Sequence, residues 1–153
     1  MTKQTGRPIK VLFLCTANAA RSQMAEALLR HRHGDRFDAH SAGLEPAGIH
    51  PLVGPVLKEI GVTMDGQRSK SVAEYLGSEH FGYIITVCAA AEKNCPTAFP
   101  DIAIRLHWPV DDPAGPGTPA EQLARFRAAR DELDRRIGDW ISHLPGNGSD
   151  ERA

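Results

Sequence analysis

The sequence lacks an excess of charge of either sign, and it lacks long hydrophobic runs. Its 18 Lys and Arg residues nearly balance 19 Asp and Glu residues, so the formal net charge is −1. Without a basic surface, neither a nucleic acid nor an anionic membrane is expected as a partner. No apolar run approaches the roughly 20 residues that span a bilayer, and residues 1–5 are polar, unlike a signal peptide. These absences predict a cytoplasmic protein, which we expect to be a monomer.

Cysteine is also scarce, because the chain has only three: Cys15, Cys88 and Cys95. An odd number in a reducing compartment argues against a disulfide framework and for catalytic or redox use. The 153 residues suffice for one domain with a substantial core, and no repeat or linker divides them. We expect a flexible N-terminus over residues 1–8, one domain over 9–144 and a disordered polar tail over 145–153.

Short apolar segments alternate with helical patterns along the chain. Strands are predicted over residues 9–14, 37–41, 81–88 and 102–108, and all but the second are expected to be buried. Helices are predicted over residues 23–30, 51–60, 71–76 and 119–143. Such alternation is typical of an α/β fold, here a single-domain, doubly wound parallel sheet with helices on both faces and a flavodoxin-like strand order.

The second predicted helix has its own start signal. Pro51 suits the first helical turn, and Leu52, Val56 and Ile60 would form the buried face. Pro55 lies inside the same pattern, where it is expected to cost the helix a backbone hydrogen bond.

The last two predicted helices differ in length and in their signals. The short helix is expected to be capped by Ser71, with Glu74 three residues later completing a capping box. The long helix has apolar residues at steps of three and four, which are expected in the core: Leu123, Phe126, Ala129, Leu133, Ile137, Trp140 and Leu144.

The most informative segment is the stretch Cys15-Thr16-Ala17-Asn18-Ala19-Ala20-Arg21-Ser22. The residues between Cys15 and Arg21 are mostly small, so a loop can direct its backbone N–H groups at one tetrahedral anion. The planar guanidinium of Arg21 can grip two anion oxygens. These donors, the following helix and the Ser22 hydroxyl favour a thiolate at Cys15. The segment predicts a nucleophile in an oxyanion-binding loop; alternatively, Cys15 is merely a small apolar residue that ends a buried strand.

Cys88 and Cys95 form a second group, seven positions apart. Cys88 ends a predicted strand at the same sheet edge as Cys15. The close ligand spacing of zinc sites is absent, so no metal site is expected. Two such cysteines by themselves are usually inert, but beside an activated Cys15 they predict a thiol relay.

Asp111 and Asp112 lie in a loop rich in Pro and Gly after the last predicted strand. A thiolate that attacks an oxyanion must expel a poor leaving group, so a nearby carboxyl group should donate a proton. We assign this role to Asp112, because Pro113 stiffens the loop and helps to orient the carboxyl group. The alternative is an Asp-Pro turn with solvated carboxylates.

Together these motifs resemble the thioredoxin-coupled arsenate reductases, which share the low-molecular-weight protein tyrosine phosphatase fold. The resemblance spans about residues 9–144 and rests on the segments 15–26, 41–43, 87–88, 95–96 and 107–115. The oxyanion loop and the Asp-Pro pair would fit the phosphatases equally well. The spacing of Cys88 and Cys95 selects the reductases, as does Ala114-Gly115, where tyrosine phosphatases tend to carry aromatic residues.

The resemblance implies a mechanism in which Cys15 attacks arsenate while Asp112 protonates the departing oxygen. Cys88 then attacks Cys15, arsenite leaves, and Cys95 next attacks Cys88. The resulting disulfide between Cys88 and Cys95 is reduced by thioredoxin. Thioredoxin is therefore the expected partner, and no tightly bound cofactor is expected.

The resemblance also implies a potassium site, formed in well-known members by an acidic residue, a loop Asn and a Ser. Asn18 and Ser41 match, with Glu26 nearby, but Lys70 stands at the acidic position. Its ammonium group can stand where the ion would sit, which argues against potassium dependence. A solvated Lys70 is the alternative.

Two rival functions stay open at this point. One is a phosphatase that acts on phosphotyrosine or a small phosphoester. The other is a noncatalytic thiol sensor or metalloid-binding module that uses its three cysteines to signal.

Overall fold

The computed structural model describes residues 8–75, 79–89 and 103–144. The tail over 145–153, nearly all of the expected N-terminal segment and Cys95 lie outside these ranges. None of the described helices is long and apolar enough to cross a membrane.

The core of the fold is one sheet of four parallel strands in the order β2-β1-β3-β4. The strands are β1 (Ile9–Cys15), β2 (Phe37–Gly43), β3 (Tyr83–Thr86) and β4 (Ile104–His107). This order confirms the doubly wound, flavodoxin-like prediction. The chain leaves β1 toward β2 and later returns to β3 on its other side, so the carboxyl end of β1 lies at the switch point where such sheets bind ligands.

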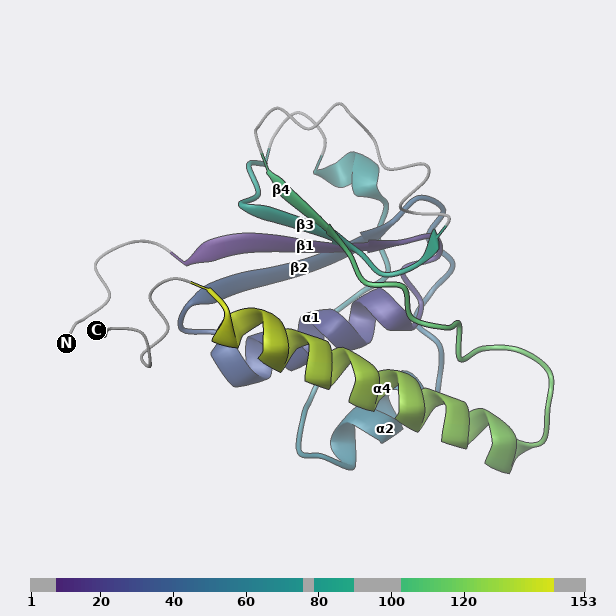
Figure 1. Cartoon of the computed structure of the whole chain (residues 1–153). Helices are drawn as coiled ribbons and strands as arrows, with labels where there is room; N and C mark the ends of the chain where they lie inside the picture. Colours follow the sequence, from purple (N-terminus) through teal and green to yellow (C-terminus); the bar gives the residue numbers. More distant parts are fainter. Residues whose placement is uncertain (1–7, 76–78, 90–102, 145–153) are drawn as a thin grey trace.

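Three helices cover one face of the sheet, as Figure 1 shows: α1 (Arg21–His33), α2 (Val53–Lys58) and α4 (Pro119–Ser142). Trp140 of α4 packs against Phe37 of β2 and Tyr83 of β3, with ring centroids 5.1 and 5.0 Å apart. On the other face, the short 3₁₀ helix η1 (Val72–Glu74) leads into Tyr75, whose ring meets His40 of β2 at 5.5 Å. Helices thus lie on both faces.

The second helix is shorter than predicted, and of its three predicted buried residues Val56 alone is fully buried. It begins at Val53 rather than Pro51, and its buried side chains are Val53, Val56 and Leu57, whereas Leu52 and Ile60 are half-buried. Pro55 consequently falls in the first turn. The N–H groups of that turn have no partner within a helix, so Pro55 costs no hydrogen bond there.

The predicted helix over 71–76 is a single 3₁₀ turn in its described part, and its capping box is absent. The Ser71 hydroxyl accepts from the N–H of Ala73 at 3.1 Å, while the Glu74 carboxylate pairs with Arg68 instead of reaching back. A complete capping box does occur at the start of α4, between Thr118 and Glu121. The ion pair with Arg68 competes for Glu74, which the local sequence pattern does not reveal.

The prediction that the fourth strand is buried was wrong. β4 is the last strand of the sheet, and Ile104 is 54% exposed. An apolar run predicts a strand but does not say whether a neighbour covers it. Burial resumes just beyond β4, at Trp108 and Val110.

Candidate active site

A cavity at the carboxyl edge of the sheet is lined by residues of the Cys15 loop, residues 15–22. Cys15 ends β1 and Arg21 begins α1, so strand and helix fix both ends of the loop. The cavity holds about 320 Å³ and is lined by Cys15, Thr16, Ala17, Ala19, Ala20, Arg21, His50, Asp112 and Ala114. The structure therefore brings Cys15, Arg21 and Asp112 together from two distant parts of the chain.

The backbone of the Cys15 loop is held from outside by its carbonyl groups. Those of Cys15, Thr16, Ala17 and Ala19 accept hydrogen bonds of 2.7–3.1 Å from N–H groups within residues 44–50. In the described part of the chain, no acceptor engages the N–H groups of residues 16–20, and no side chain caps α1. N–H groups arranged in this way can bind an anion.

Gly43 of β2 allows this close packing. A Cβ atom there would lie 2.7 Å from both the Asn18 nitrogen and the Thr16 oxygen, which no side chain tolerates. Asn18 itself adopts a left-handed backbone conformation with φ of 48°, which Asn tolerates better than most residues.

A buried hydrogen-bond chain leads from Asn18 to the Cys15 sulfur. The N–H of Lys70 donates to Asn18 Oδ1 at 2.9 Å, which fixes the orientation of the amide. The Asn18 amide nitrogen therefore donates to Ser22 Oγ at 2.8 Å and to Ser41 Oγ at 3.0 Å. Because Ser22 Oγ accepts from Asn18, its hydroxyl hydrogen is free to donate to Cys15 Sγ, 3.0 Å away. Such a donor stabilises a thiolate.

Lys70 lies at the end of this hydrogen-bond chain that is remote from Cys15, and its side chain is buried rather than solvated. Its Nζ lies 3.8 Å from Glu26 Oε1, which accepts from the Ser41 hydroxyl at 2.5 Å. Burial lowers the pKa of Lys70, although the Glu26 carboxylate opposes this shift.

The cluster around Glu26 does not fit a potassium ion. Asn18 Oδ1 is engaged by a backbone N–H, and the Ser41 hydroxyl donates to Glu26. The ammonium group of Lys70 supplies the positive charge beside the carboxylate. In the described residues, no group of three or more His, Cys, Asp or Glu side chains could hold a metal ion.

Arg21 and Asp112 meet at the rim of the cavity. Arg21 donates to the Val110 carbonyl at 2.9 Å, and its guanidinium lies 3.7 Å from Asp112 Oδ2. Asp112 Oδ1 also accepts from the N–H of Ala114 at 3.0 Å, which orients the carboxylate. Asp111 lines a neighbouring cavity instead, and it is absent from the lining of the Cys15 cavity.

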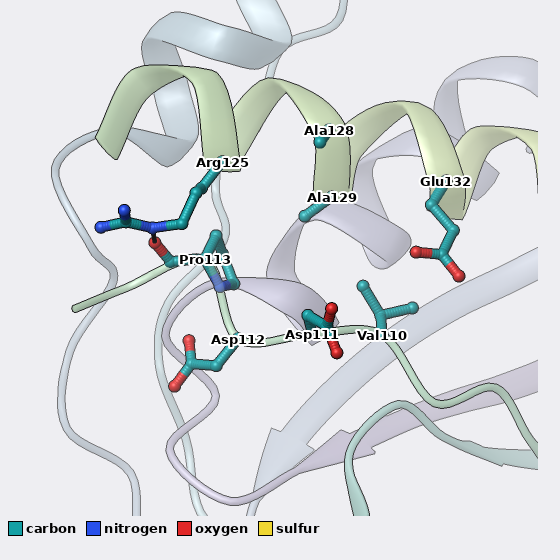
Figure 2. A pocket seen from close by; sticks show the side chains of 8 residues that line it. All are labelled: Val110, Asp111, Asp112, Pro113, Arg125, Ala128, Ala129 and Glu132. Atoms are coloured by element: carbon teal, nitrogen blue, oxygen red, sulfur yellow. Dashed lines mark hydrogen bonds between the residues drawn. The ribbon is translucent and has the colours of Figure 1, made fainter. Parts of the chain in front are cut away.

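Figure 2 shows how α4 supports this loop. Arg125 reaches from α4 and donates to the carbonyl oxygens of Pro113, Gly115 and Pro116 at 2.9–3.1 Å. The Asp112 carboxylate lies on the side of the loop away from α4 (Figure 2). A fixed backbone thus presents Asp112 toward Arg21.

Cys88 follows β3 and is also buried. The Val87 N–H donates to the Leu14 carbonyl, which places the ends of β3 and β1 side by side. Cys88 Sγ lies 3.5 Å from the hydroxyl of Thr16, the residue after Cys15. Cys95 lies outside the described residues.

The comparison with known families agrees with this geometry. The family model described as low molecular weight phosphotyrosine protein phosphatase matches residues 10–149. The chain belongs to this family. The match covers β1 from its second residue onward, the other three strands and all described helices of the fold.

Relatives within the low molecular weight phosphatase family carry arsenate reductase names. The arsenate reductase of Halalkalibacterium halodurans is 41% identical over 128 residues, covering 83% of this chain and 91% of that protein. A solved arsenate reductase in its phosphate-binding state is 27% identical with a TM-score of 0.72, covering 88% of this chain and 97% of that one. The thioredoxin-dependent arsenate reductase of Corynebacterium glutamicum is 30% identical with a TM-score of 0.63, covering 90% of this chain and 63% of that one.

The roles of three residues around the cavity were not predicted from the sequence. Arg125 anchors the Asp112 loop, as described above. Buried Gln23 donates to the carbonyls of Asn18 and Arg68 at 3.1 and 2.9 Å, which ties the Cys15 loop to the segment before Lys70. His50 lines the cavity itself. Part of what places them is distant in sequence, such as Arg68 for Gln23 and Ala19 for His50, and no local pattern signals such contacts.

Proposed function

We propose that this chain reduces arsenate to arsenite through Cys15, Cys88 and Cys95, with thioredoxin as the reductant. The observation that carries the proposal is the position of Cys88, 3.5 Å from Thr16 of the very loop that holds Cys15. A phosphatase needs only the oxyanion cavity, whereas a reductase also needs a second thiol near the first. The arsenate reductase names of the relatives and the thioredoxin dependence of one solved neighbour support the proposal.

In the first step, the Cys15 thiolate attacks the arsenic atom of arsenate, forming an S–As bond. The loop N–H groups and Arg21 hold the other oxygens, and Asp112 protonates the departing oxygen, which leaves as water. Arsenic keeps its oxidation state in this step. The hydrogen bond from Ser22 to Cys15 supports the thiolate before the attack.

Arsenic is reduced in the second step. The Cys88 thiolate attacks Cys15 Sγ, the S–As bond breaks, and its electron pair stays on arsenic, which leaves as arsenite. The two sulfurs become a disulfide. Cys95 then attacks Cys88 and releases Cys15, and thioredoxin reduces the disulfide between Cys88 and Cys95. The hydroxyl of Thr16 is positioned to stabilise the Cys88 thiolate.

The lining of the cavity also favours a small inorganic substrate. Ala17, Ala19, Ala20 and Ala114 line it, and His50 is its one ring among the described residues. A phosphotyrosine substrate would find no pair of aromatic side chains there to enclose its ring.

The full chain should produce arsenite when supplied with arsenate, thioredoxin, thioredoxin reductase and NADPH. NADPH consumption and arsenite release are measured together, with an aryl phosphate as the comparison substrate. Fast release of phosphate without any arsenite would show a phosphatase instead. Tight arsenite binding without turnover of either substrate would show a sensor.

Asp112→Asn should slow formation of the first arsenic adduct by about 100-fold, because the amide cannot donate the proton. Phosphate binding should change little, since Arg21 and the loop N–H groups are retained. Rapid-quench mass spectrometry of a single turnover measures the adduct. Asp111→Asn is the matched control, because Asp111 lines the neighbouring cavity. A damaging Asp111→Asn together with a mild Asp112→Asn would reassign the acid.

Exchanging potassium for sodium should change neither the activity nor the melting temperature, because Lys70 supplies the charge beside Glu26. A specific ion that binds only the folded state raises the melting temperature with its concentration. Lys70→Asp is the comparison variant, in which two carboxylates face each other and potassium should stabilise the fold. A potassium-specific rise in the original chain would show that a cation site persists there.

A further inference from the structure

We propose that His50 is a substrate-binding residue whose Nε2–H donates a hydrogen bond to an oxygen of the oxyanion held over Cys15. The inference rests on the proposed function, which takes this oxyanion to be arsenate and phosphate to be its analogue. His50 carries no role in the steps described above, although it lines the same cavity as Cys15, Arg21 and Asp112.

The backbone ties His50 directly to the Cys15 loop. Its N–H donates to the Ala19 carbonyl at 2.9 Å, the last of the bonds that join residues 44–50 to the loop. The ring therefore keeps a constant position relative to the N–H groups that are expected to hold the oxyanion. A residue in this place can add a contact from outside the loop.

The ring of His50 is held in a defined orientation. It packs on Phe126, a fully buried residue of α4, with ring centroids 4.5 Å apart and planes inclined by 36°. Its Nδ1 accepts a hydrogen bond from the N–H of Leu52 at 3.1 Å. Because a backbone N–H can only donate, Nδ1 must be the unprotonated nitrogen, and the neutral ring carries its proton on Nε2.

The Nε2–H group is then available to donate a hydrogen bond. Among the described residues, no hydrogen bond engages this nitrogen. An oxyanion in the cavity supplies oxygens that only accept, and a hydrogen bond to a charged oxygen is stronger than one to a neutral group. His50 therefore complements Arg21, since it binds the substrate without adding a charge.

Two variants separate substrate binding from the structural role of Nδ1. In His50→Asn, the side-chain oxygen can still accept from the Leu52 N–H, as in an Asx turn, but the shorter amide cannot reach the oxyanion. In His50→Phe, the ring on Phe126 is kept while both nitrogens are lost. Calorimetric titration of the reduced full chain with phosphate should show a Kd raised about 10- to 100-fold in both variants.

Nitrogen NMR of the histidine rings tests the same inference without a variant. The spectrum should show His50 protonated at Nε2, and added phosphate should shift the Nε2 resonance. A proton on Nδ1 would overturn the inference, as would a His50→Asn variant that binds phosphate as tightly as the original chain. In the latter case, His50 serves only the backbone turn.

These measurements need no reductant, so they are independent of the reductase proposal. If the original chain makes no arsenite but both variants lose phosphate affinity, the reductase proposal fails and the His50 assignment stands. If the chain is a reductase, the variants should raise KM for arsenate more than they lower kcat, as expected for lost binding. A lowered kcat at unchanged KM would contradict a binding role.

Discussion

Replacing Cys15 with serine should remove arsenate turnover and any aryl phosphatase activity, with a loss of about 10⁴-fold or more. A serine hydroxyl stays protonated at neutral pH, and among the described residues its side-chain hydrogen-bond partner would be Ser22, which is not a base. A thiol ionises far more readily than a hydroxyl, and a hydrogen bond from Ser22 can stabilise the thiolate that attacks the substrate. The steady-state rate of arsenite release measures the effect.

The matched control for Cys15→Ser is Ser22→Ala. This variant keeps the sulfur nucleophile and removes only its hydrogen-bond donor, so it should lose far less activity. Phosphate binding and the melting temperature of Cys15→Ser should stay close to those of the original chain, because the loop is held by backbone hydrogen bonds from residues 44–50. Measurable turnover by a folded Cys15→Ser variant would exclude Cys15 as the nucleophile.

The Cys15 loop could be predicted from the sequence because the residues that determine its structure are contiguous. The apolar run that forms β1, the small residues of the loop and the helix formers after Arg21 all lie within one stretch of chain. The parallel sheet and its strand order followed from the alternation of strands and helices. Local pattern and global fold agree here, as in most foldable sequences.

The surroundings of Lys70 could not be settled in the same way. The sequence left a buried ammonium and a solvated one as equal alternatives. The deciding contacts join segments far apart in sequence, since the Lys70 N–H bonds Asn18 52 residues away. Gln23 bridges the same two segments. Lys70 is thus buried by tertiary packing, which a local sequence pattern does not predict.

The same limit explains the errors in the fold. The pattern in residues 51–60 predicted a helix and the burial of Val56 correctly, but it placed Leu52 and Ile60 on the buried face, where the structure has Val53 and Leu57. This helix packs on α4 and α1. The apolar residues of β4 predicted a strand but not its place at the end of the described sheet order. Both depend on which neighbour each element meets.

The second large effect should come from Cys88→Ser, which should stop thioredoxin-driven turnover while leaving the chemistry of Cys15 intact. Without this sulfur, no described residue can attack the arsenic adduct on Cys15. Aryl phosphatase side activity should persist, since the loop, Arg21 and Asp112 are unchanged. The comparison of arsenite release with aryl phosphate hydrolysis in one preparation is therefore diagnostic.

Cys95→Ser should stop the cycle one step later. A single round can finish, giving one arsenite per chain and a disulfide between Cys15 and Cys88, which is visible as a cross-linked peptide by mass spectrometry after stoichiometric arsenate. In the original chain, the disulfide should instead join Cys88 and Cys95.

The two variants together test the order of the relay. Each exchange requires the attacking sulfur to come within bonding distance of about 2 Å in normal disulfide geometry. If Cys95→Ser keeps full thioredoxin-coupled activity, the third cysteine is not part of the cycle, and an external thiol must resolve the first disulfide. If Cys88→Ser keeps full thioredoxin-coupled activity, an attack by Cys88 does not release the arsenic. The position of the Cys88 thiol beside Thr16 then has no role in the reaction.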